Sequence, residues 1–163
     1  MSRLIGHLEA IRKADNVQII WQYGKFYNDE IKAELAKQDK VENLIATDFI
    51  SSMDNAYACA DLVVSRAGAS SISELCLLKK PCILVPSPNV AEDHQTKNAM
   101  ALSTKGAAIL VKDADARNEL VQVALTTVND DRKLKELSGN VGKLAYHDSA
   151  NIIAEEVFKL AKG

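Results

Sequence analysis

The sequence predicts an α/β fold, a Rossmann-like parallel sheet with helices on both faces. Short apolar, β-branched segments alternate with segments of helical period, and each apolar segment is bounded by polar or turn residues. Strict alternation of strand and helix favours parallel strands joined by right-handed helical crossovers. A chain of 163 residues is long enough to bury the core of one such unit.

Five segments have the apolar composition of buried strands. They are 16–24 (NVQIIWQYG), 43–49 (NLIATDF), 61–65 (DLVVS), 81–86 (PCILVP) and 107–111 (AAILV). The segments of helical period that precede and separate them are 4–14, 27–38, 53–60, 71–79 and 95–104. We expect 118–162 to be helical throughout, with a break at 138–140, and to close the sheet or pack beside it. No repeat, low-complexity segment or linker divides the chain, so 1–163 is predicted to be a single lobe.

The composition argues against several classes of protein. Twenty basic and 22 acidic residues give a net charge of −2 without a Lys/Arg block, which is not the electrostatic signature of a nucleic-acid partner. No apolar stretch approaches the roughly 20 residues that a transmembrane helix needs. The N-terminal residues lack the apolar core and cleavage site of an export signal, so we expect a cytoplasmic location.

The three cysteines indicate neither a disulfide framework nor a zinc site. Cys59, Cys76 and Cys82 are odd in number, lie in or beside apolar segments and have no C-x-x-C spacing. Buried, reduced thiols are therefore expected, and no metal site is predicted.

Two strand-to-helix junctions have the composition of a ligand site. In an open α/β sheet, ligands bind at the carboxyl ends of the strands, where loops and helix N-termini converge. Residues 66–69 (RAGA) lead from one strand into the helix that begins SSISE, and small residues before a helix N-terminus suit a phosphate group. The second junction, 85–99 (VPSPNVAEDHQTKNA), is a long polar loop entering a helix, with Asp93, His94, Gln95 and Asn98 close together.

Structural interpretations compete at both junctions. Residues 71–74 (SISE) match the capping box S-x-x-E, in which Glu74 would bond only to the first N–H groups of its own helix. The other polar or small residues could be ordinary turn, surface or loop residues: Arg66, Gly68, His94, Gln95 and Asn98.

Several motifs in order resemble a known family. They are W-Q-Y-G-K at 21–25, F-I-x-x-M at 49–53, D-L-V-V-S-R-A-G-A-x-x-x-x-E at 61–74, P-x-x-x-V-P at 81–86 and H-Q-x-x-N-A at 94–99. Together they cover nearly the whole chain, and they resemble the C-terminal lobe of the MurG family. Members of that family are bacterial N-acetylglucosaminyltransferases that convert lipid I into lipid II in peptidoglycan synthesis.

The resemblance implies a two-lobed GT-B glycosyltransferase whose C-terminal lobe binds the donor, UDP-N-acetylglucosamine. Glu74 matches the acid that binds the ribose hydroxyls, Ile50 a residue whose backbone meets the uracil, and Gln95 a glutamine that contacts the sugar hydroxyls. The turn and helix start that face the phosphates and the nucleotide correspond to Ala69, Ser70, Ser71, Ile72 and Ser73. Candidate contacts beside this set are Arg66, Gly68, His94 and Asn98. No catalytic residue is assigned, and the family needs no metal or other cofactor.

The chain also departs from the family pattern. The family lobe opens with a strand and a G-G-S-x-G-A loop, but Met1 falls where the following helix should already be under way. The loop before His94 is about one residue longer than the usual form. The resemblance implies an N-terminal lobe outside this sequence, which would supply the acceptor site for lipid I, the membrane-docking surface and the base. We therefore expect a fragment of a longer inverting transferase, inactive alone, whose full-length form contacts the cytoplasmic face of the inner membrane. An exposed lobe surface would suit a homodimer.

Other functions remain open at this point. The lobe could belong to another GT-B sugar-nucleotide enzyme, such as a UDP-N-acetylglucosamine 2-epimerase, or to a stand-alone donor-binding subunit that needs a catalytic partner. A dinucleotide-dependent oxidoreductase is disfavoured because the sequence lacks the G-x-G-x-x-G fingerprint.

Overall fold

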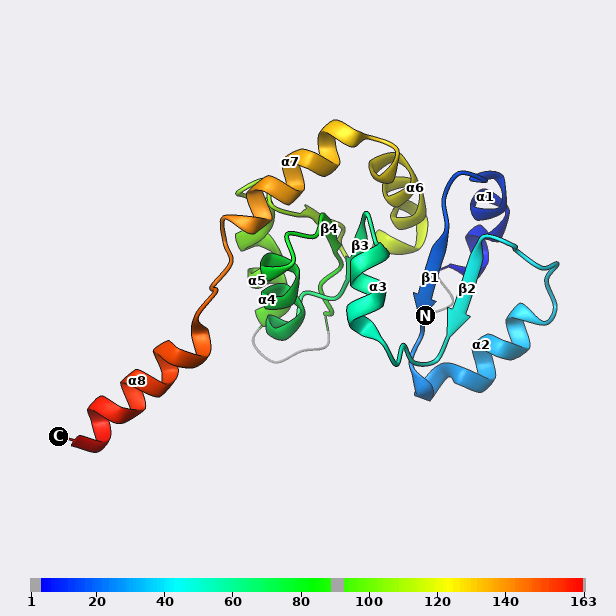
Figure 1. The fold of residues 1–163 in the computed structure, drawn as a ribbon. Helices are drawn as coiled ribbons and strands as arrows, with labels where there is room; N and C mark the ends of the chain where they lie inside the picture. Colours follow the sequence, from blue (N-terminus) through cyan, green and yellow to red (C-terminus); the bar gives the residue numbers. More distant parts are fainter. Residues whose placement is uncertain (1–3, 89–92, 163) are drawn as a thin grey trace.

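The five strands lie where the sequence predicts them, each shorter than its apolar segment. They are β1 (Ile19–Gln22), β2 (Leu44–Thr47), β3 (Val63–Ser65), β4 (Cys82–Leu84) and β5 (Ile109–Leu110). The structure is a computed structural model that describes residues 4–88 and 93–162 (Figure 1). All strand pairs in it are parallel, which confirms the predicted α/β class.

The strands form two ladders where one continuous sheet was expected. β1 pairs with β2, while β4 lies between β3 and β5. Ile19 is opposite Leu44 in the first ladder, and Val63 is opposite Cys82 in the second. β1 and β3 lie on either side of the division and share no ladder among the described residues, so the expectation of a single sheet is corrected.

The helices follow the predicted alternation. They are η1 (Ile5–His7), α1 (Leu8–Lys13), η2 (Lys25–Tyr27), α2 (Asn28–Leu35), α3 (Met53–Cys59), α4 (Ala69–Leu77), α5 (His94–Ser103), α6 (Ala116–Val128), α7 (Asp131–Gly142) and α8 (Ser149–Lys162). The predicted break at 138–140 is wrong, because α7 continues through it with Leu137 and Val141 fully buried on one face. The chain breaks instead before α7, where the Asp130 side chain caps the helix by accepting from the N–H of Lys133 at 2.9 Å. It breaks again at 143–148, between α7 and α8, so the expectation of helix throughout is also corrected.

β4 is buried on both faces. Cys82 and Leu84 pack with residues of α4, α5 and α7, including Leu75 and Val141. On the other face, Ile83 packs with residues of α6. Helices therefore cover both faces of the second ladder, as predicted for a Rossmann-like sheet.

The first ladder is covered on one face only. Its inner side packs on α1 through Ile11 and on α6 through Val121. On its outer side, Ile20 and Ile45 are 46% and 60% exposed. Parallel sheets are usually covered on both faces by helices, and an exposed face that carries apolar side chains is therefore unusual.

The last helix does not pack on either ladder. The side chains of α8 are exposed along its described length, and the helix extends away from the rest of the molecule (Figure 1). The expectation that the chain end packs beside the sheet is thus confirmed for α6 and α7 and wrong for α8.

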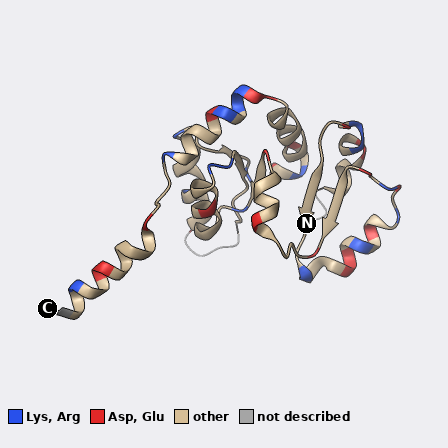
Figure 2. Ribbon diagram, viewed as in Figure 1, with Lys and Arg blue, Asp and Glu red and all other residues tan. Residues whose placement is uncertain are grey.

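Charges of both signs lie along α2 and α7 (Figure 2). Among the residues described, no helix combines the length and apolar character needed to cross a membrane.

The three cysteines should differ sharply in reactivity. All are free thiols, but Cys59 is exposed where burial was expected, because it lies at the end of α3 away from the core. Burial raises the pKa of Cys76 and raises that of Cys82 to about 12, which keeps both thiols protonated near neutral pH.

We expect an aromatic disulfide reagent to modify one thiol in the folded chain and all three after denaturation. A Cys59→Ser variant should lose the rapid reaction, and rapid modification of further thiols in the folded wild type would contradict the assignment.

Candidate functional site

The carboxyl ends of β3, β4 and β5 meet at one edge of the second ladder. Parallel strands end on the same side, so the loops that follow them are neighbours in space. α4 begins after the loop that follows β3, and α5 begins after the loop that follows β4. The two junctions chosen from the sequence therefore lie at a common edge.

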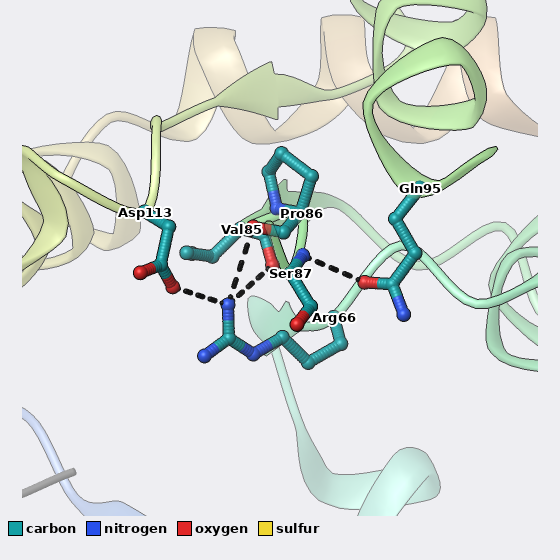
Figure 3. A network of polar contacts seen from close by, with 6 residues as sticks. All are labelled: Arg66, Val85, Pro86, Ser87, Gln95 and Asp113. Carbon is teal, nitrogen blue, oxygen red and sulfur yellow. Dashed lines mark hydrogen bonds and ion pairs between the residues drawn. The ribbon is translucent and has the colours of Figure 1, made fainter. Parts of the chain in front are cut away.

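Arg66 links the ends of three strands at this edge. Its Nη1 donates to the carbonyl oxygens of Val85 at 3.2 Å and Pro86 at 3.3 Å (Figure 3). The same nitrogen lies 2.6 Å from a carboxylate oxygen of Asp113, which follows β5. Arg66 thus holds the loops after β4 and β5 against the end of β3.

Two residues of α5 fasten the same loops. The side-chain oxygen of Gln95 accepts from the N–H of Ser87 at 2.8 Å, and its amide nitrogen is turned away from that contact (Figure 3). Asn98 donates to the carbonyl oxygen of Ala67 at 3.2 Å. His94 is exposed as the first residue of α5, and the lengthened loop before it falls partly outside the described residues.

The start of α4 has no side-chain cap. Gly68 is the N-cap residue in extended conformation, and the first backbone bond of the helix runs from the N–H of Ile72 to the Gly68 carbonyl at 3.0 Å. Among the described residues, no hydrogen bond engages the N–H groups of Ala69, Ser70 or Ser71. Unpaired N–H groups at a helix N-terminus, together with the helix dipole, favour an anionic ligand.

The capping-box interpretation of residues 71–74 is wrong. Because α4 begins at Ala69, Ser71 lies inside the helix and cannot be its N-cap. The Glu74 carboxylate instead accepts from the phenol of Tyr57 on α3, with Oη to Oε2 at 3.0 Å. Glu74 and Ser70 are both exposed and lie four residues apart, hence on one face of the helix. An acid therefore lies one turn beyond the open N–H groups.

Ile50 lies at the corresponding edge of the first ladder. Its N–H donates to the side-chain oxygen of Gln22 at 2.8 Å, which ties the loop after β2 to the end of β1. Within the described residues, no hydrogen bond or ion pair joins Ile50 to α4 or α5. The structure brings Arg66 and Gln95 into one network and places Ile50 outside it.

Two further residues support this site and were not predicted from the sequence. Gln22 lies within the W-Q-Y-G-K motif and could have been selected there as a polar residue ending a strand. Tyr57 has no such signal, because its contact with Glu74 depends on how α3 and α4 pack.

A surface hollow lies away from the site edge. A hollow of about 340 Å³ lies near the amino ends of β3 and β4, with Asp61, Lys80 and Pro81 in its lining. The Lys80 ammonium there donates to the carbonyl oxygens of Ala58 and Ala60, at 3.4 and 2.8 Å. In the part of the chain that the structure describes, no cluster of three or more His, Cys, Asp or Glu side chains could hold a metal ion.

The fold defines a class of protein, a Rossmann-like α/β lobe, in which ligands bind at the carboxyl ends of the strands. The model for the glycosyltransferase family 28 C-terminal domain matches residues 2–153. The chain belongs to this family.

Curated relatives and a solved structure agree with this assignment. The chain is 58% identical over 159 residues to the UDP-N-acetylglucosamine--N-acetylmuramyl-(pentapeptide) pyrophosphoryl-undecaprenol N-acetylglucosamine transferase of Bacteroides thetaiotaomicron, covering 98% of this chain and 43% of the relative. The protein of the same name from Cytophaga hutchinsonii is 51% identical, with 94% of this chain and 40% of the relative covered. The MurG crystal structure from Acinetobacter baumannii shares the fold with a TM-score of 0.77 at 24% identity, over 98% of this chain and 49% of that one. The chain thus spans less than half the length of these relatives.

Replacing Arg66 should destabilise the fold. Arg66→Ala removes an ion pair and leaves the Val85 and Pro86 carbonyls without their donor, and we expect the free energy of unfolding to fall by about 1–3 kcal/mol. Urea denaturation measures the change. Lys159→Ala on α8, whose ion pair with Glu156 is exposed, is the control and should leave stability nearly unchanged. Equal stability of the two variants would show that the Arg66 network is dispensable.

Proposed function

We propose that this chain is the donor-binding lobe of the transferase that adds N-acetylglucosamine to lipid I, which forms lipid II. The observation that carries the proposal is the exposed Glu74 carboxylate one turn beyond the uncapped start of α4. It is supported by membership of the glycosyltransferase family 28 C-terminal domain and by relatives named as transferases of N-acetylglucosamine from its UDP derivative.

α4 would bind the diphosphate and the ribose of UDP-N-acetylglucosamine. The open N–H groups of Ala69, Ser70 and Ser71 suit the phosphate oxygens, and the absence of an acidic residue in the first turn avoids repulsion. Ile72 and Ser73 continue this helix start. Glu74 would accept hydrogen bonds from the two ribose hydroxyls, since a carboxylate has acceptor sites on both oxygens.

The uracil and the sugar would be bound by groups from other elements. The Ile50 carbonyl is suited to accept from the uracil N–H, whereas its own N–H already donates to Gln22. The Gln95 amide nitrogen, turned away from Ser87, is available to donate to a sugar hydroxyl. Arg66, Gly68 and Asn98 are assigned to shaping the turn, and His94 to the rim of the site.

In the proposed reaction, the 4-hydroxyl of the muramyl sugar attacks the anomeric carbon of the donor. The new C–O bond forms as the bond to the UDP oxygen breaks, the anomeric configuration inverts, and a base takes the hydroxyl proton. Negative charge grows on the leaving diphosphate, where the N–H groups and dipole of α4 would stabilise it. Among the described residues no side chain is assigned as the base.

The strand order supports completion of this lobe by polypeptide outside the chain. A doubly wound sheet has the order 3-2-1-4-5-6, with its first strand at the centre. The two observed ladders are β1 with β2, and β3 with β4 and β5. They match that order if one further strand lies between β1 and β3, at the centre of the sheet. Ile20 and Val64, on the strands that border the division, are 46% and 44% exposed. We assign this place to a strand and its glycine-rich loop, which would join the single lobe 1–163 to an N-terminal lobe.

The remaining partners follow from this placement. Lipid I and the cytoplasmic face of the inner membrane would be contacted through the N-terminal lobe. The exposed apolar side chains around the first ladder would be covered there, or by a second copy of this chain when the N-terminal lobe is missing: Ile20, Ile45, Phe49 and Val64.

Uridine-selective binding should depend on Glu74. We expect weak binding of UDP and UDP-N-acetylglucosamine by the wild-type chain, with ADP and NAD binding more weakly still. Glu74→Ala should weaken UDP binding by on the order of tenfold, the loss typical of hydrogen bonds to a charged group. Calorimetric titration measures both affinities.

A matched variant controls for the loss of a carboxylate. Glu156→Ala removes an exposed glutamate from α8, far along the chain from the site, and should bind UDP as the wild type does. A Glu74→Ala variant that binds UDP normally would exclude Glu74 as the ribose ligand. Lack of any uridine preference in the wild type would argue against the donor site as a whole.

The chain alone should not transfer sugar at a measurable rate. It would lack the acceptor site and the base, so incubation with UDP-N-acetylglucosamine and a soluble lipid I analogue should give no lipid II above background. Radiolabelled sugar transfer is the measurement, with the full-length transferase of a relative as the positive control. Transfer at a normal rate would overturn the assignment of the base to another lobe.

A further inference from the structure

We propose that Tyr57 is a positioning residue that orients the Glu74 carboxylate and thereby determines the preference for ribonucleotides over 2′-deoxyribonucleotides. The inference rests on the proposed function, since it requires that Glu74 binds the ribose. It adds to the site a residue from α3, a helix that carries none of the contacts described above for the donor.

The contact joins two helices at the edge of the core. Tyr57 Oη donates to Glu74 Oε2 at 3.0 Å. The ring of Tyr57 packs against the buried cluster that contains Leu75 and Cys76 of α4, so the phenol is fixed relative to that helix. The hydroxyl therefore projects from a packed ring toward an exposed acid.

A glutamate on an exposed helix face samples several rotamers, and a ligand that needs one of them must order the side chain. The Tyr57 bond holds one carboxylate oxygen and so restricts the rotamers that the Glu74 side chain samples. Oε1 and the second lone pair of Oε2 remain to accept from two adjacent hydroxyls. A pre-oriented acceptor pair distinguishes a ribose, which offers both hydroxyls, from a deoxyribose, which offers one.

The phenol keeps its proton over the working pH range. Burial, and then the hydrogen bond and charge of Glu74, raise the pKa of Tyr57 to about 12. Because this pKa is raised above its ordinary value of about 10, the contact is complete below pH 10 and is lost as the pH rises through 12. Tyr57 is thus a donor to Glu74, and not a base, near neutral pH.

The test compares UDP with 2′-deoxy-UDP in four proteins by titration calorimetry. They are the wild-type chain, Tyr57→Phe, Glu74→Ala and the control Tyr146→Phe, which makes the same chemical change at a side chain that is 79% exposed. We expect Tyr57→Phe to weaken UDP binding by roughly five- to tenfold and 2′-deoxy-UDP binding by less than about threefold. The control should keep both wild-type affinities.

Each result has a distinct meaning. A reduced preference for UDP in Tyr57→Phe and in Glu74→Ala supports the proposal. An unchanged preference in Tyr57→Phe, with the preference lost in Glu74→Ala, overturns it while the donor site stands. A preference unchanged in Glu74→Ala, or absent from the wild type, shows that Glu74 does not bind the ribose, and the proposal is overturned. Lack of any UDP binding by the wild type shows that the proposed function itself has failed, and the proposal fails with it.

A measurement without ligand tests the contact independently. The chain has four tyrosines, and absorbance near 295 nm follows their ionisation. One phenol should titrate near pH 12 in the wild type and be missing from the Tyr57→Phe titration. In Glu74→Gln its pKa should fall, although burial still holds it above the ordinary value. An identical titration in Glu74→Gln and the wild type would show that Tyr57 does not contact Glu74 in solution.

Discussion

The burial of β4 on both faces is the constraint on which the rest of the structure depends. α4, α5 and α7 pack against one face of β4 and α6 packs against the other. The helices on both faces therefore hold β4 in one position between them. Parallel pairing with β3 and β5 then brings three strand ends to one edge. The Arg66 network joins the loops at that edge, and the positions of α4 and α5 follow from it.

The uncapped start of α4 has a direct chemical consequence. A capping glutamate would have satisfied the helix N–H groups and placed its own negative charge beside them, which would repel a phosphate. In the structure Glu74 interacts with Tyr57, so the acid and the N–H groups remain separate features of one helix face. Separate placement allows one helix to bind an anion at its start and a pair of hydroxyls one turn later.

The sequence predicted those features of the fold that local pattern determines. The strands and the alternation of helices follow from composition and period, and α5 begins within one residue of the expected position. The glycine at 139 suggested a break, but the burial of Leu137 and Val141 outweighs the helix propensity of one residue. The division into two ladders and the contacts of Tyr57 and Gln22 depend on packing between distant segments, which no local pattern encodes.

The division of the sheet also bears on how the proposed site works as a whole. The groups assigned to the phosphates, ribose and sugar lie on the second ladder, whereas Ile50, assigned to the uracil, belongs to the first. The described strands of the two ladders do not pair with each other. α6 contacts both ladders, on the inner side of the first and on one face of the second. A rigid nucleotide needs both parts at a fixed separation, so a strand bonded to β1 and β3 would do more than complete the core. It would fix the distance between the uracil contact and α4, and affinity for the donor would then depend on that strand as well as on the residues assigned to the ligand.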